Sequence, residues 1–389
     1  MESASNLSIL QPQQGRKDHR DIIAPTIRLH KGQRDVLDLA AYGQDEITAV
    51  LPTGYGKSVV GVGTYMIQRS LGMADFCLWL VPTDALRNQV TDSAEADARI
   101  LGSSITGACD VTKEHKHFRQ IRNKTVEIFV ATYAQVARDD GFFSELMSRG
   151  KWLVIRDECH RLREDRAWGR TTAAVGGATT LNLTATPVRS DGAKSVAVPS
   201  KDSEDGTRTI LPDVSVTIRD AVKERALRAP IGHVQHYFVD LQHPNGEIQR
   251  ITTEELREEG ISEFSSYEAR KSLRYCRKYL SKMLLEIIQK HDEKNMRHEN
   301  QHQCLVFAMT TSHAEAVTGQ LNDLAGYRFA DWIGVNRDAK TNEKVLNEYM
   351  GNGPTRAGHK TSLRPEDRLP CLVQVDMASE GFNNPRTSI

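Results

Sequence analysis

The chain has 389 residues, enough for two or three domains of ordinary size, and its 26% charged and 39% hydrophobic residues are typical of a globular protein. Its formal net charge of +0 excludes a generally basic nucleic-acid binder, so any such contact has to come from a local patch. The six cysteines form no CxxC pair, which favours reduced thiols in a cytoplasmic protein over a disulfide framework or a zinc site. No apolar run approaches the ~20 residues that span a bilayer, so no membrane partner is expected.

The N-terminal part of the chain, residues 1–33, precedes a candidate phosphate-binding turn. Residues 1–26 are rich in Ser and Gln and then in basic residues, without an apolar core, and predict a flexible tail rather than a secretory signal.

Gln33 follows, in a segment that opens a helix. Its amide offers both a donor and an acceptor and can read the edge of an adenine. The alternative is an ordinary exposed helix glutamine.

A glycine-rich turn with the sequence LPTGYGKS occupies residues 51–58, between a β-branched run and an apolar segment that can continue as a helix. In this strand–turn–helix context, backbone N–H groups point at a phosphate chain. Gly54 and Gly56 let the backbone approach without a Cβ in the way. We expect Lys57 to reach the β- and γ-phosphates and the Ser58 hydroxyl to sit on Mg²⁺. The alternative is a glycine-rich turn with an ordinary lysine.

Three later apolar runs end in hydroxyl residues, at Thr83, at Thr132, and at Thr184 with Thr186. Continuous apolar runs predict strands buried on both faces of a parallel sheet, and ligands bind at the carboxyl ends of such strands. Each threonine, taken singly, can also be a cap at the end of its strand.

The run at 152–160 delivers two adjacent carboxylates to the end of a buried strand. Asp157 is expected to hold Mg²⁺, and Glu158 to orient and deprotonate the attacking water. Thr184 and Thr186, on a neighbouring strand, could hydrogen-bond His160 and relay the nucleotide state. A solvated acidic strand end is the alternative in isolation, but it loses weight beside a phosphate loop.

At these stretches the chain resembles superfamily 2 helicases and translocases. The matching stretches, in order, are Gln33 for the adenine-reading region, 52–58 for motif I, 81–83 for motif Ia, 131–133 for motif Ib, 157–160 for a DECH form of motif II and 184–187 for motif III. Residues 184–192 and 218–230 also resemble the type III restriction motor and repair branch of this superfamily.

The second half of the chain reads as a linker followed by a partial second lobe. The polar stretch within 196–232 predicts a linker, and apolar residues at helical spacing predict a helix over 262–291. Within 233–389, the strand and helix around Ser312 and His313 resemble motif IV, and 376–385 resembles motif V. Nothing after motif V supplies the paired arginines of motif VI, so the second lobe is expected to be incomplete or completed by a further chain.

The resemblance implies an α/β protein with two RecA-like lobes of parallel sheet, residues 27–195 and 233–389, with a helical insertion between them and a cleft that binds ATP and Mg²⁺. It implies catalytic roles for Lys57, Asp157, Glu158 and His160, metal binding by Ser58 and Asp157, and coupling by Thr184 and Thr186. The nucleotide would be bound by Gln33, Thr53, Gly54, Gly56, Lys57, Ser58, Gly381 and Asn383. Nucleic acid would contact Thr83, Thr132, Ser312 and His313.

The expected function is therefore an ATP-dependent helicase or translocase that acts on DNA, with RNA as the alternative nucleic acid. A second hypothesis is a nucleic-acid-binding regulator, or a fragment, whose ATPase is incomplete because it lacks the motif VI arginines. The intact Lys57, Asp157 and Glu158 argue for the first hypothesis, and the missing arginines for the second.

Overall fold

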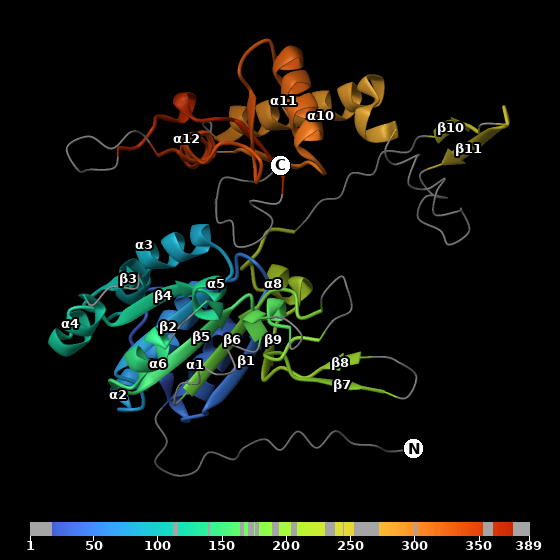
Figure 1. Cartoon of the computed structure of the whole chain (residues 1–389). Coiled ribbons are helices and arrows are strands. Elements are labelled where there is room, and N and C mark those ends of the chain that lie inside the picture. The colour runs from blue at the N-terminus through green and yellow to red at the C-terminus, as the bar shows by residue number, and fades with distance from the viewer. Residues whose placement is uncertain are drawn as a thin grey trace. The chain divides into compact units, whose positions relative to one another are not determined.

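The computed structural model describes residues 18–111, 116–138, 141–163, 167–169, 175, 179–188, 194–203, 208–229, 238–243, 245–252, 272–298, 302–352 and 361–375. The chain divides into two compact units, residues 1–230 and 231–389. Figure 1 shows the elements of both units in chain order. Each unit has its own parallel sheet, so the predicted α/β class with two such sheets is confirmed.

The first unit is built on a sheet of seven strands in the order β3-β4-β2-β5-β6-β1-β9. Every neighbouring pair in this sheet is parallel. The strands are β1 (Glu46–Val50), β2 (Phe76–Val81), β3 (Ala108–Asp110), β4 (Ile128–Thr132), β5 (Trp152–Asp157), β6 (Thr179–Thr184) and β9 (Val214–Ser215). The carboxyl ends of β1, β5 and β6 therefore lie at one edge of the sheet, where the sequence placed the candidate site.

Alternation along the strands divides the core of this unit into two layers. Cys77, Trp79 and Val81 of β2 pack on one face, while Leu78 and Leu80 pack on the other. The first face is covered by α1 (Lys31–Ala41), α2 (Lys57–Ser70) and α3 (Asp84–Ile100). The second is covered by α4 (Lys116–Asn123), α5 (Tyr133–Ala137) and α6 (Phe142–Met147). Burial on both faces explains why the strands read as continuous apolar runs.

The predicted linker 196–232 differs from the structure. It contains the hairpin of β7 (Ser200–Asp202) and β8 (Arg208–Ile210), then β9 and α8 (Ile218–Lys223). β9 pairs with β1 and extends the main sheet, and Val214 and Val216 are buried in its core. Polar composition predicts a loop at 198–209, whereas residues 213–229 read as a strand and a short helix, which the structure confirms as β9 and α8. Two buried valines and the free strand edge of β1 make this segment part of the first unit.

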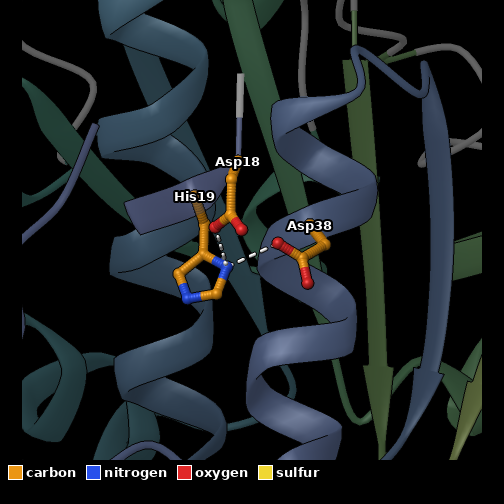
Figure 2. Close-up of side chains that lie close together, drawn as sticks. All are labelled: Asp18, His19 and Asp38. Atoms are coloured by element: carbon orange, nitrogen blue, oxygen red, sulfur yellow. Dashed lines mark hydrogen bonds and ion pairs between the residues drawn. The ribbon is translucent and has the colours of Figure 1, made fainter. Parts of the chain in front are cut away.

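The predicted tail 1–26 is also shorter than expected, because residues from Asp18 onward pack against the first unit. Ile23 is buried, and the Thr26 N–H donates to the Ile100 carbonyl at 2.7 Å. Figure 2 shows the anchor of the short 3-10 helix that starts this segment: Nδ1 of buried His19 lies 2.5 Å from Asp38 Oδ1 and 3.2 Å from Asp18 Oδ1. Arg20 also pairs with Asp18 and lowers the pKa of that carboxyl to about 2.

The second unit has a smaller parallel sheet in the order β12-β14-β13. Its elements are the antiparallel hairpin β10 (Phe238–Gln242) and β11 (Ile248–Thr252), α10 (Arg277–His298), β12 (Cys304–Phe307), α11 (Thr311–Ala325), β13 (Ala330–Gly334), α12 (Ala339–Met350) and β14 (Cys371–Val375). None of the helices in the described parts of either unit is both long and apolar enough to cross a membrane.

The long helix α10 ends later than the predicted helix 262–291, and residues 262–271 lie outside the described residues. The buried seam of Leu280, Leu284 and Ile288 continues through His291 and Asn295. The Asn295 side chain bonds both the N–H and the carbonyl of His302. These polar side chains are satisfied locally, which allows the helix to continue past the predicted end at residue 291.

We predict that Gly102→Ala destabilises the first unit more than Gly72→Ala. Both glycines have positive φ, +75° and +70°, so alanine costs about 1–2 kcal/mol at either position. At Gly102 the new Cβ would also lie 2.1 Å from the Ala24 carbonyl oxygen, whereas nothing lies within 4 Å at Gly72. The clash should add roughly 1–3 kcal/mol and loosen residues 18–26. Thermal unfolding and trypsin cleavage at exposed Arg20 measure both effects; equal melting temperatures for the two variants would contradict the packing described here.

Candidate nucleotide-binding site

The phosphate loop follows β1 and leads directly into α2, as the sequence predicts. Gly54 and Gly56 both have φ of +85°, and Gly56 is the residue from which α2 starts. A Cβ on Gly56 would lie 2.5 Å from Nε2 of Gln33. The Leu51 N–H donates to the Thr184 carbonyl at 2.9 Å, which ties the loop to the end of β6. Glycine is therefore required here by both backbone conformation and space.

Gln33 is buried, and both ends of its amide are engaged. Oε1 accepts the His30 N–H at 2.8 Å, and Nε2 donates to the Tyr55 carbonyl at 2.9 Å. The alternative of an exposed helix glutamine is excluded by this burial. The side chain holds the loop through the Tyr55 carbonyl. Its Nε2 keeps one further N–H and its Oε1 one further lone pair, so recognition of adenine by this amide stays a prediction.

Tyr55, inside the loop, connects it to two distant segments. Its hydroxyl accepts the Gly32 N–H at 3.1 Å and donates to Glu224 Oε2 at 2.7 Å. Burial, together with the Glu224 carboxylate, raises the pKa of Tyr55 to about 12, so the hydroxyl stays protonated. Leu227, just beyond Glu224, lies 3.0 Å from the position of a Cβ on Gly54. The loop is thus held between α1 and the segment after α8.

The two motif II carboxylates lie at the end of β5, beside the loop lysine. Lys57 Nζ is 2.5 Å from Glu158 Oε1, and both side chains are largely buried. Glu158 has φ of +50°, a left-handed conformation that is unusual for a glutamate. Its N–H donates to Asp157 Oδ1 at 2.9 Å, and the buried hydroxyl of Tyr133 donates to the Asp157 carbonyl at 2.6 Å. This strained turn directs both carboxylates toward the loop.

Burial dominates the electrostatics of Asp157. It raises the pKa of that carboxyl to about 6; Lys57 opposes the shift and Glu158 adds to it. The donor set fits Mg²⁺, which prefers carboxylate and hydroxyl oxygens and would supply the positive charge that the buried Asp157 lacks. Ser58 is the second predicted metal residue. Burial raises the pKa of Asp97 in α3, and the Ser58 hydroxyl opposes that shift. Asp97 was not among the residues singled out from the sequence.

The expected hydrogen bond between His160 and motif III is present. Nδ1 of His160 lies 2.9 Å from Thr184 Oγ1, and both residues are buried. His160 Nδ1 is also 3.6 Å from Glu158 Oε2. The Thr186 N–H donates to Thr184 Oγ1 at 3.2 Å, so Thr186 supports Thr184 through its backbone. The relay of nucleotide state through this chain stays a prediction.

The remaining predicted residues differ in exposure, and two of them lie outside the described residues. Thr83 is exposed and caps α3, and Ser312 is exposed in the first turn of α11. Thr132 is buried and caps α5 together with Gln135, and His313 is buried with Nδ1 accepting the Met309 N–H. Thr53 is exposed in the phosphate loop. Gly381 and Asn383 lie outside the described residues.

We predict that Asp157→Asn stabilises the Mg²⁺-free protein at neutral pH. The pKa of Asp157 is raised from 3.8 to about 6 on folding, so its contribution to stability is full below 3.8 and is lost as pH rises through about 6. Asparagine does not ionise, and the variant should be more stable by roughly 2–3 kcal/mol above about pH 7 and by nothing near pH 3.8. Urea unfolding across this pH range measures the difference; an advantage for the wild type at neutral pH would contradict it.

We predict that Tyr55→Phe weakens nucleotide binding, whereas the matched Tyr65→Phe does not. Both rings are buried and both hydroxyls donate one hydrogen bond, Tyr55 to Glu224 and Tyr65 to the Asp75 carbonyl. Each variant should lose about 1–2 kcal/mol of unfolding free energy. Only Tyr55→Phe releases the phosphate loop, so only there should the Kd for ADP rise, roughly threefold to tenfold by calorimetry. Equal Kd values for the two variants would mean that the loop does not depend on Glu224.

Comparison with known proteins identifies a family that matches the part of the chain containing this site. Residues 22–189 match the family model described as the type III restriction enzyme, res subunit. No curated protein matches the chain in sequence. The chain is similar to the solved structure of UvsW from bacteriophage T4, at 15% identity and a TM-score of 0.32, covering 93% of this chain and 60% of that one.

Two further solved structures share this likeness. Lhr helicase of Mycobacterium smegmatis, bound to single-stranded DNA and AMP-PNP, has 15% identity and a TM-score of 0.49, with 94% of this chain and 41% of that one covered. An S. cerevisiae Dbp5 variant bound to RNA has 13% identity and a TM-score of 0.49, with 92% and 73% covered. The chain thus spans 60% of the length of the UvsW chain and 41% of the length of the Lhr chain. The family match contains the phosphate loop and both motif II carboxylates, so residues 22–189 form a domain similar to the type III restriction enzyme, res subunit.

Proposed function

We propose that this chain hydrolyses ATP with Mg²⁺ and uses the energy to move along or unwind DNA. The observation that carries the proposal is the buried pair of Lys57 and Glu158, with Asp157 beside it, at the end of β5. One lysine and two carboxylates at the mouth of a phosphate loop are the groups that phosphoryl transfer to water requires. The match to a restriction-enzyme family supports DNA as the nucleic acid.

Each residue has a distinct task in this proposal. Lys57 exchanges its ion pair with Glu158 for the β- and γ-phosphates, and this exchange frees the Glu158 carboxylate. Glu158 then orients a water molecule for in-line attack and accepts its proton. Asp157 and Ser58 would hold Mg²⁺, which would supply positive charge to neutralise the charge that develops on the phosphate oxygens. His160 and Thr184 link the turn of Glu158 to the end of β6.

Nucleic acid would be held through its backbone at exposed helix starts. Thr83 at the start of α3 and Ser312 at the start of α11 are exposed, and a helix start offers backbone N–H groups and hydroxyls to phosphates. Thr132 and His313, which are buried, fit this task less well and are more simply explained as a cap and a packed core residue. Contacts of this kind carry little base specificity, and they weaken as salt rises.

We predict that ATP hydrolysis by the chain is stimulated by DNA and that Glu158→Gln lowers kcat roughly 10²–10⁴-fold. Loss of the general base should leave Mg²⁺·ATP binding intact, because glutamine keeps the size of the side chain. Phosphate release, measured with single-stranded DNA, duplex DNA and RNA in parallel, tests both the activity and the choice of strand. The matched control is Glu95→Gln, an exposed glutamate on α3, which should hydrolyse ATP as the wild type does.

The same assay separates the second hypothesis, a nucleic-acid-binding regulator without hydrolysis. That hypothesis predicts salt-dependent DNA binding, in a filter or anisotropy assay, with phosphate release equal in wild type and Glu158→Gln. Hydrolysis that no nucleic acid stimulates would count against movement along a strand, and an affinity for DNA unchanged by salt would count against backbone contacts.

A further inference from the structure

The indole of Trp79 is a buried polar group that the site described so far does not use. Trp79 lies in the middle of β2 and is fully buried, on the face covered by α2. Its Nε1–H meets no hydrogen-bond acceptor at bonding distance within the described residues. A buried donor left without a partner costs about 1–3 kcal/mol, so its retention beside a functional site calls for a reason.

The register of the sheet places this N–H next to motif II. Trp79 pairs with Ile155 on β5, and Asp157 lies two residues farther along that strand, on the same face. The indole is near enough to the Asp157 carboxylate to lower its pKa, against the larger effect of burial. The indole of Trp79 therefore lies on the same face of the sheet as the one carboxylate proposed to hold Mg²⁺, on the neighbouring strand.

The ring is fixed in this position by the phosphate-loop helix. A Cβ on Gly61, four residues after Lys57 in α2, would lie 2.2 Å from Cη2 of Trp79, so the indole packs directly against the helix backbone. Because the ring is locked between β2 and the first turns of α2, its N–H is held at a fixed place relative to both the loop and Asp157.

We propose that Trp79 is a positioning residue for Mg²⁺·nucleotide: its indole N–H donates a hydrogen bond to the Asp157 carboxylate and, with the Glu158 N–H, sets the orientation in which Asp157 meets the metal. The proposal rests on the proposed ATPase function. Two N–H donors on one carboxylate fix its rotamer and leave the remaining lone pairs for Mg²⁺.

Trp152 provides a matched control within the same sheet. It lies in β5, is buried, and its Nε1 also has no hydrogen-bond partner among the described residues. Its side chain packs in the layer on the opposite face of the sheet, away from α2. Any effect of losing a buried indole N–H as such should therefore appear in both residues, whereas an effect on the metal site should appear at Trp79 alone.

The contact itself is tested by indole ¹H–¹⁵N spectra of the full chain labelled at its four tryptophans, with Trp79→Phe and Trp152→Phe giving the assignments. Mg²⁺·ADP should move the Trp79 indole proton downfield and leave that of Trp152 in place. In the nucleotide-free protein, Asp157→Ala should move the Trp79 resonance and not the Trp152 resonance. A Trp79 resonance that responds neither to Asp157→Ala nor to Mg²⁺·ADP would overturn the proposal.

The consequence for binding is tested by titrating Mg²⁺ at fixed ADP. Trp79→Phe keeps a ring in the pocket but removes the donor, so half-saturation should require about three to ten times more Mg²⁺, while ADP binding without Mg²⁺ stays as in the wild type. Trp152→Phe should show the wild-type Mg²⁺ requirement, and equal effects of the two variants would overturn the positioning role. If the wild type hydrolyses no ATP but the Trp79 resonance responds to Asp157→Ala, the proposed function fails and the contact stands.

Discussion

The site depends on one electrostatic constraint: a single lysine is buried with two adjacent carboxylates. Lys57 pairs with Glu158, and Asp157 is left with a buried charge that its surroundings disfavour, as its raised pKa shows. Removing a charge from water without a full partner costs several kcal/mol, so this arrangement is stable only as a compromise. A divalent cation and a phosphate chain would resolve it, because the cation would serve Asp157 and the phosphates would take Lys57.

The compromise holds because the backbone around it is fixed from several sides. Glu158 is kept in a left-handed conformation, and the Tyr133 hydroxyl holds the Asp157 carbonyl. On the other side, Gln33 and the Tyr55–Glu224 pair hold the phosphate loop. Charged groups that are fixed in place by rigid packing cannot relax into a lower-energy arrangement on their own. Pre-organised sites of this kind are costly in stability and useful in catalysis.

The sequence predicted those parts of the site that lie within short, continuous segments of the chain. The phosphate loop, the strand ending in Asp157 and the strand ending in Thr184 each occupy a short window with its own period and turn, and the structure has them where they were expected. Glu224 could not be found this way, because its partner Tyr55 is 169 residues away and no local pattern marks the pairing. His313 illustrates a different limit: a residue at a helix start looks exposed in sequence, but the face it occupies is decided by packing.

The segment after motif III changes how the first unit should be understood. Composition made 196–232 look like a connection between lobes, yet β9 completes the edge of the sheet beside β1, and Glu224 and Leu227 reach the phosphate loop. The strand that carries the loop is therefore supported on one side by β6, which ends in Thr184, and on the other by β9. Since both neighbours are contributed by chain that follows motif II, the loop reaches its final geometry only after the chain has returned twice to β1. The candidate nucleotide site is in this sense a property of the whole unit to residue 229, and a boundary drawn after motif III would remove the contacts that hold the loop in place.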